Sequence, residues 1–191
     1  LLAEMVKALR IRDLGMEGLY RVPGRISKVQ EINQLVDSNV SELCDRLVWD
    51  EEAFDGRAIS SAIKRYLGAL PVSLLNANMF AFVVAETGSA TERVSRSLRT
   101  PAGLTSALCQ LRVARVKAFG CPVNVTAEDR EGGWCLATLD YVMRHLREVV
   151  ALQAINRMSP RALALRLAPC LFGSPEYARP RHARVVEYLF D

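Results

Sequence analysis

The stretch Gly18-Leu19-Tyr20-Arg21-Val22-Pro23-Gly24 contains the residues best suited to chemistry in this 191-residue chain. Val22-Pro23-Gly24-Arg25 predicts a type II turn, because proline presets φ at the second position and glycine accepts the positive φ at the third. Arg21 lies beside this turn. Its planar, permanently charged guanidinium can neutralise charge on a transferring phosphoryl group at a water-poor interface. Taken alone, such an arginine is most often a solvated surface residue, so the interpretation needs support from elsewhere in the chain.

Two further stretches supply that support. Residues 58–75 predict a helix that carries Lys64 and ends at Leu70-Pro71. Residues 155–172 contain an Asn156-Arg157-Met158-Ser159 helix start, followed by Leu163-Ala164 and by Ala168-Pro169-Cys170-Leu171-Phe172. In this order the three stretches resemble the Rho-type GTPase-activating (RhoGAP) domain, in which a Gly-Leu-Tyr-Arg-like loop carries an arginine finger.

The resemblance implies a function and a partner. Arg21 would be the catalytic residue, supplied in trans to a Rho-, Rac- or Cdc42-like small GTPase in its GTP-bound form. That partner would carry GTP and magnesium, so the resemblance implies no cofactor and no metal in this chain. The alternative is a catalytically weak or inactive module that uses the same helical surface to bind small GTPases or to scaffold other proteins.

The remaining site residues fall into two groups by resemblance. One group would face the partner and the other would support the loop. The alternative for Lys64 is an ordinary exposed lysine, and the surrounding motif favours the partner contact. Asn156 is assigned to loop support because asparagine readily hydrogen-bonds to nearby backbone groups. The partner-facing residues are Lys64, Arg25 and Arg65, and the loop-supporting residues are Gly18, Pro23, Gly24 and Asn156.

Two positions depart from the family's pattern. Gly68 stands where the family has an arginine in its Tyr-Leu-Arg-x-Leu-Pro segment, and Ala162 stands where it has an asparagine just before Leu-Ala. Both missing groups are polar. The resemblance therefore implies weaker positioning of the loop or weaker binding of the partner, and favours the inactive alternative at these two positions.

Hydrophobic periodicity predicts an all-α fold, with apolar residues at three- and four-residue spacing and no sustained alternation. A RhoGAP-like bundle of about eight or nine helices is expected. Ser27 and Gln30 predict a capping box, and Ser159-Pro160 predicts a capped helix start. The expected helices are residues 2–14, a segment that follows Ser27, and residues 55–70, 76–86, 101–117, 134–152, 160–168 and 180–190.

Composition favours one domain spanning residues 1–191, because half of the residues are hydrophobic. The resemblance covers nearly the whole chain, and it implies a domain excised from a larger protein. Residues 119–133 are polar and contain glycine, so they predict an extended surface loop. His145 has no cysteine or serine neighbour spaced to form a nucleophile pair, which predicts a structural or solvated histidine.

The net charge of +4 is a modest excess, without the dense basic face and interleaved aromatic residues of a nucleic-acid-binding protein. The five cysteines lack the close paired spacing of a zinc site. No apolar run is long enough to span a membrane and no signal sequence is present, so a cytoplasmic protein with only weak or indirect membrane contact is expected.

Overall fold

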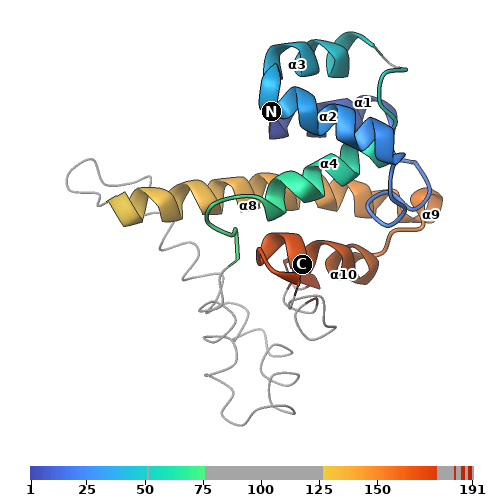
Figure 1. Ribbon diagram of the computed structural model, residues 1–191. Coiled ribbons are helices and arrows are strands. Elements are labelled where there is room, and N and C mark those ends of the chain that lie inside the picture. Colours follow the sequence, from blue (N-terminus) through green and yellow to red (C-terminus); the bar gives the residue numbers. More distant parts are fainter. Residues whose placement is uncertain (51, 76–126, 176–182, 184–185, 188, 191) are drawn as a thin grey trace. The chain divides into compact units, whose positions relative to one another are not determined.

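The computed structural model describes residues 1–50, 52–75, 127–175, 183, 186–187 and 189–190 (Figure 1). These residues form seven helices and no strand, which confirms the all-α prediction. The predicted helices at 76–86 and 101–117 lie outside the described residues, as does most of the one at 180–190. The helices are α1 (Leu2–Arg12), α2 (Ile26–Ser38), α3 (Val40–Trp49), α4 (Gly56–Gly68), α8 (Ala127–Ala151), α9 (Gln153–Asn156) and α10 (Pro160–Leu171).

The chain divides into two compact units. The first comprises Leu1–Pro71 and Met143–Asp191, and the second comprises Val72–Val142. Every site residue named above belongs to the first unit. A single domain over residues 1–191 stays a prediction.

Helix α4 organises the core of the first unit, since it packs against α1, α2 and α10. Its apolar stripe of Ile59, Ile63 and Leu67 is almost fully buried. Burial of such side chains is the main term that stabilises a helix of this length, because isolated short helices are marginal in water. The facing helices contribute Met5, Val6 and Leu9 of α1, Ile32 of α2, and Leu163, Leu167 and Leu171 of α10.

Side-chain caps fix several helix starts. Asp55 accepts a hydrogen bond from the Ala58 amide at 2.8 Å and begins α4, as the sequence predicts. The predicted cap at Ser159 is also confirmed, because its hydroxyl accepts from the Ala162 amide and Pro160 takes the first helical position. Helix α10 continues through Pro169 to Leu171, beyond the predicted end at 168.

The predicted capping box at Ser27 is wrong. Helix α2 begins at Ile26, two residues earlier than predicted, and Arg25 at the cap position makes no side-chain capping bond. A reciprocal cap instead begins α3, which the sequence interpretation missed. Oδ1 of Asn39 accepts a hydrogen bond from the Glu42 backbone amide, and Nδ2 of Asn39 donates one to the Glu42 carboxylate, both at 3.2 Å.

Two other boundaries differ from prediction. Residues 127–133 belong to α8, not to a surface loop, while residues 119–126 lie outside the described residues. The run Ala127-Glu128-Asp129-Arg130-Glu131 is mostly composed of good helix formers, and acidic residues favour a helix N-terminus. Helix α1 ends at Arg12, before the predicted Leu14, and Asp13 takes the position that follows the helix.

Candidate functional site

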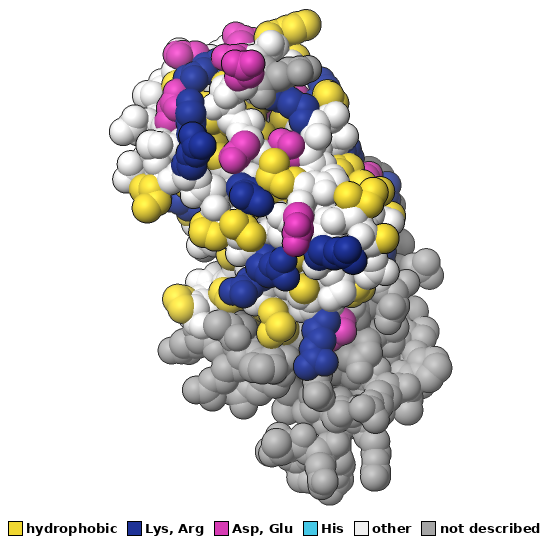
Figure 2. All heavy atoms as spheres, turned by 90° about the vertical axis from the view of Figure 1, so that its right-hand side faces the viewer, with side chains coloured by type: hydrophobic (Ala, Val, Ile, Leu, Met, Phe, Trp, Pro, Cys, Tyr) yellow, Lys and Arg dark blue, Asp and Glu magenta, His cyan; other side chains and the backbone are white. Residues whose placement is uncertain are grey.

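Residues 13–25, here called the Arg21 loop, connect α1 to α2 on the side of the first unit that Figure 2 turns toward the viewer. Lys and Arg side chains lie among hydrophobic ones on this face (Figure 2). Within the loop, Gly18 O accepts hydrogen bonds from the amides of Arg21 and Val22, both at 2.8 Å. The chain therefore closes a tight turn from Gly18 to Arg21, and this turn ends at the candidate catalytic residue.

The turn does not have the predicted form. The left-handed residues of the loop are Gly18, with φ of 73°, and Tyr20, with φ of 67°. Gly24 does not have a positive φ, so the predicted type II turn over residues 22–25 is wrong. Gly18 is the residue that a left-handed backbone requires here, and Tyr20 adopts a conformation that costs a non-glycine residue on the order of 1–2 kcal/mol.

Gly24 supports the loop through close approach. A Cβ at this position would lie 2.4 Å from Ala58 Cα and 2.5 Å from Ala58 N in the first turn of α4. The Gly24 amide also donates to Ser61 Oγ at 3.1 Å. The downstream end of the Arg21 loop is thus seated on α4, and only glycine fits against that backbone. Pro23 precedes it and is exposed.

Arg21 itself is exposed. Its guanidinium folds back over the turn, with Nη2 3.5 Å and Nε 3.6 Å from the position that a Cβ on Gly18 would occupy. A Cβ at Gly18 would therefore clash with Val22, whose Cγ2 lies 2.7 Å from the same position, while the Arg21 guanidinium lies at an ordinary contact distance from it.

Lys64 is joined to the Arg21 loop. Its Nζ donates a hydrogen bond to Tyr20 O at 2.8 Å, from the third turn of α4. Burial lowers the pKa of Lys64; the thiol of Cys170 opposes this shift and Arg166 adds to it. An ammonium that has lost water binds a carbonyl oxygen more strongly, so Lys64 fixes the peptide group that links Tyr20 to Arg21.

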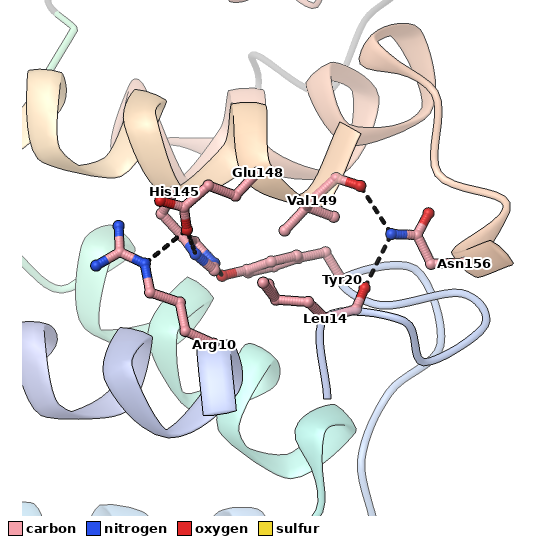
Figure 3. A network of polar contacts seen from close by, with 7 residues as sticks. All are labelled: Arg10, Leu14, Tyr20, His145, Glu148, Val149 and Asn156. Carbon is pink, nitrogen blue, oxygen red and sulfur yellow. Dashed lines mark hydrogen bonds and ion pairs between the residues drawn. The ribbon is translucent and has the colours of Figure 1, made fainter. Parts of the chain in front are cut away.

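Tyr20 is completely buried, and its hydroxyl lies 2.7 Å from Nε2 of His145 on α8 (Figure 3). Burial raises the pKa of the Tyr20 phenol, which keeps it protonated. Burial also lowers the pKa of His145 to about 4, so the imidazole is neutral at pH 7. His145 is therefore a structural histidine, and the neutral pair shares one hydrogen bond inside the core.

Asn156 fastens the opposite side of the Arg21 loop (Figure 3). Its fully buried amide Nδ2 donates to Leu14 O at 3.0 Å and to Val149 O at 2.8 Å, and its Oδ1 accepts from the Met158 amide at 2.9 Å. The backbone of Asn156 contributes as well, because its carbonyl accepts from the Gly18 amide at 2.8 Å. One residue thus connects α8, α9 and the first half of the loop.

The arginines assigned to the partner-facing group flank this assembly. Arg25 at the start of α2 and Arg65 beside Lys64 are both exposed. Arg57 was not singled out from the sequence, yet its guanidinium donates to Glu17 O at 3.4 Å. Its position at the second residue of α4, next to an aspartate cap, gives the only sequence signal for this contact.

The two departures from the family pattern lie on α4 and α10. Gly68 is exposed, and a Cβ there would meet only Cys170 Cα, at an ordinary 3.8 Å. Ala162 lies in the first turn of α10 and is half-buried. Neither position supplies a polar side chain to the site.

Two kinds of feature are absent from the described part of the chain. Among residues 1–50, 52–75 and 127–175 and the few described beyond them, no three His, Cys, Asp or Glu side chains gather closely enough to hold a metal ion. Within those same residues, no helix combines the length and the apolarity needed to cross a membrane.

The sequence matches the family model of the RhoGAP domain over residues 1–112 and 135–176. The chain belongs to the RhoGAP domain family. The matched residues include the Arg21 loop, helix α4 and the Asn156 segment, which are the parts that the structure joins by hydrogen bonds.

This RhoGAP domain is similar to parts of much longer curated proteins. Unconventional myosin-IXa of Rattus norvegicus is 23% identical over 177 residues, which cover 93% of this chain and 6% of that protein. Rho GTPase-activating protein 10 of Mus musculus is 33% identical over 99 residues, 50% of this chain and 12% of that protein. Probable Rho-type GTPase-activating protein 2 of Schizosaccharomyces pombe is 25% identical over 155 residues, 81% and 10% respectively. The chain thus spans only 6 to 12% of the length of these relatives.

Solved structures share the fold of this RhoGAP domain. The crystal structure of human Rho GTPase activating protein 15 gives a TM-score of 0.67 at 17% identity, covering 99% of this chain and 79% of that one. The BH domain from GRAF, the GTPase regulator associated with focal adhesion kinase, gives 0.63 at 20% identity, covering 99% and 88%. The helical architecture is therefore shared at low sequence identity.

Proposed function

We propose that this domain accelerates GTP hydrolysis by a Rho-family small GTPase, with Arg21 as the group supplied to the partner's active site. The proposal is supported by the family, by relatives named as Rho GTPase-activating proteins, and by the geometry of the loop. The observation that carries the proposal concerns Arg21 and the residue before it. Arg21 is exposed, while the carbonyl and the side chain of Tyr20 are both held by hydrogen bonds.

The chemistry follows from where charge develops. In phosphoryl transfer, negative charge spreads over the oxygens of the transferred group in the transition state, so a guanidinium placed there stabilises that state more than bound GTP. Arginine fingers contribute about 10³ to 10⁵ in rate, which corresponds to roughly 4–7 kcal/mol. An ordinary surface ion pair contributes about 0–1 kcal/mol and could not supply this. GTP and magnesium would be carried by the partner, in its GTP-bound state.

Positioning matters as much as charge. A misplacement of about 1 Å can lower a rate on the order of a hundredfold. Lys64 holds the peptide group before Arg21, Gly24 seats the loop on α4, and Asn156 binds its other side. With one donor used on Tyr20, Lys64 keeps two others with which to contact the partner, alongside Arg25 and Arg65. These contacts would govern docking more than the chemical step.

The test is single-turnover GTP hydrolysis by Rho, Rac and Cdc42 proteins, each alone and with increasing amounts of the domain. Here kcat is the rate at saturating domain, and KM is the domain concentration that gives half of it. Arg21→Ala should abolish most of the acceleration, and Arg21→Lys should fail almost as badly, because an ammonium lacks the planar two-pronged geometry. Arg25→Ala, which changes a neighbouring exposed arginine, should raise KM and leave kcat unchanged.

A second candidate function is nucleotide-dependent binding of a small GTPase without catalysis. Gly68 and Ala162 favour it, since the exposed space above Gly68 and the first turn of α10 lack the polar groups of the family pattern. No acceleration despite selective binding of the GTP-bound partner would establish this function. If the two positions only weaken an active site, Gly68→Arg combined with Ala162→Asn should raise kcat in a domain that retains Arg21.

A further inference from the structure

Tyr20 is held at both ends. Its carbonyl oxygen accepts from Lys64 Nζ at 2.8 Å. Its hydroxyl lies 2.7 Å from Nε2 of His145, as Figure 3 shows. The two rings meet edge to face, with centroids 5.9 Å apart and planes at 63°. The residue that directly precedes Arg21 is therefore fixed by α4 at its backbone and by α8 at the tip of its side chain.

This double attachment opposes a real strain. Tyr20 has φ of 67°, a left-handed conformation that an aromatic residue adopts only when its surroundings hold it there. A relaxed Tyr20 would move to negative φ and rotate the Tyr20–Arg21 peptide group. The hydrogen bonds from the Arg21 and Val22 amides to Gly18 O would open with it. Such strain persists at sites where a precise geometry is needed.

The imidazole is buried beside an ion pair. His145 is 1% exposed, and its Nδ1, which has no hydrogen-bond partner among the described residues, lies 3.9 Å from Oε2 of Glu148, one turn further along α8. The same carboxylate oxygen is 2.6 Å from Nε of Arg10 on α1 (Figure 3). Arg10 and Glu148 are the charged groups beside the ring, and the desolvated imidazole remains neutral. The hydrogen bond of the buried ring is the one between its Nε2 and the Tyr20 hydroxyl.

We propose that His145 is a positioning residue for Arg21, and that it acts through the hydroxyl of Tyr20. The bond from His145 keeps the Tyr20 ring seated, the seated ring keeps the backbone left-handed, and that backbone directs Arg21 to the partner. The inference rests on the proposed function, because positioning has a catalytic consequence only if Arg21 is catalytic. It also makes a structural claim that can be measured without any GTPase.

The structural arm uses NMR-detected hydrogen exchange of the Arg21 and Val22 amides, whose bonds to Gly18 O report whether the turn is closed. Tyr20→Phe keeps the ring and removes only the hydroxyl. It should speed exchange of both amides about tenfold, the effect of losing one hydrogen bond that holds the turn. Ile32→Val, which shortens a fully buried side chain on α2 and removes no hydrogen bond, should leave both amides unchanged.

The catalytic arm measures kcat and KM with the preferred GTPase. Tyr20→Phe and His145→Leu should each lower kcat about tenfold with KM within about twofold of wild type, because the contact surface persists while Arg21 is misdirected. His145→Gln, whose amide can still bond the Tyr20 hydroxyl, should recover most of the loss. Ile32→Val should have normal kcat even if its thermal stability falls as far as that of Tyr20→Phe.

The outcomes separate the two proposals. Unchanged exchange of the Arg21 and Val22 amides in Tyr20→Phe would overturn the positioning role, as would a loosened turn with normal kcat. A rise in KM alone would also overturn it. A wild-type domain that accelerates no GTPase would overturn the proposed function, and the exchange arm would then decide separately whether His145 holds the turn. Should His145→Leu fail to fold, Tyr20→Phe carries both arms.

Discussion

Lys64 Nζ donates a hydrogen bond to Tyr20 O at 2.8 Å, and so joins the third turn of α4 to the residue that directly precedes Arg21. The bond connects positions 44 apart in the sequence. The sequence resemblance assigned Lys64 to the partner-facing surface, and this hydrogen bond shows that Lys64 also shapes the loop. The partner contact itself stays a prediction, but the loop contact gives Lys64 a second role with a distinct kinetic signature.

Lys64→Met should lower kcat by about 10- to 100-fold, because a hydrogen bond from a charged donor contributes roughly 1.5–3 kcal/mol. The thioether retains most of the aliphatic packing and leaves Tyr20 O without its donor. The matched control is Arg65→Met, one residue along α4 and exposed, which should change KM and spare kcat. Single-turnover hydrolysis measures both variants. A changed KM with normal kcat in Lys64→Met would assign Lys64 to docking alone.

Two glycines associated with α4 should respond oppositely to alanine. Gly24→Ala would bring a Cβ within 2.4 Å of Ala58 Cα, so the loop must move, at a cost of roughly 1–3 kcal/mol. Gly68→Ala meets only Cys170 Cα at 3.8 Å and removes a poor helix former, so it should stabilise by roughly 0.5–1 kcal/mol. Urea denaturation of both variants measures the difference. Equal effects would contradict the close approach at Gly24.

Asn156→Ala should destabilise the domain by on the order of 3 kcal/mol. It removes the group that donates to Leu14 O and Val149 O, and the oxygen that accepts from the Met158 amide. Asn156→Asp keeps an acceptor for Met158 and loses both donors. It should therefore be at least as destabilising at pH 7, where a carboxylate would face two carbonyl oxygens.

Chemical denaturation monitored by circular dichroism tests this pair of variants. Gln153→Ala, at an exposed position in α9, is the control and should stay within about 0.5 kcal/mol of wild type. A wild-type-like Asn156→Asp variant would show that the two donated bonds contribute little.

The site could be identified from the sequence because the motif residues occur in the family's order even at low identity. The contacts that support the Arg21 loop, in contrast, join residues that are far apart in the sequence. The sequence placed Arg21 on a loop that α1 and α2 hold, and it placed Asn156 among the supports. It assigned the positive φ to Gly24, because a Pro-Gly pair is the usual signature of a type II turn. Gly18 takes that conformation instead, since the chain must turn there to meet Asn156 O.

The role of Tyr20 could not be predicted from local pattern. Nothing in a tyrosine's propensities favours a φ of 67°, and the hydroxyl finds its partner 125 positions away on α8. Capping shows the same limit at shorter range. Ser27 and Gln30 fit the capping pattern, yet α2 begins at Ile26 without a side-chain cap, after Gly24 is seated on α4.

His145 should make the stability of the domain depend on pH. Burial, partly opposed by Glu148 and reinforced by Arg10, lowers its pKa from 6.5 to about 4 in the folded state. Above pH 6.5 both the folded and the unfolded chain hold a neutral imidazole, and the stability is complete. As the pH falls from 6.5 toward 4, the unfolded chain takes up a proton that the folded chain refuses, so the free energy of unfolding decreases.

The expected loss is on the order of 3 kcal/mol, because a tenfold difference in proton affinity between the folded and the unfolded chain corresponds to about 1.4 kcal/mol. Urea denaturation at pH 7.5 and pH 4.5 should show it as a difference between wild type and His145→Gln, because other titrating groups contribute to both. The free energy of unfolding of His145→Gln should depend less on pH over this window than that of wild type, although it should be lower at pH 7.5. Parallel curves would mean that the imidazole is protonated in the folded domain, and that the Tyr20 hydroxyl accepts from His145.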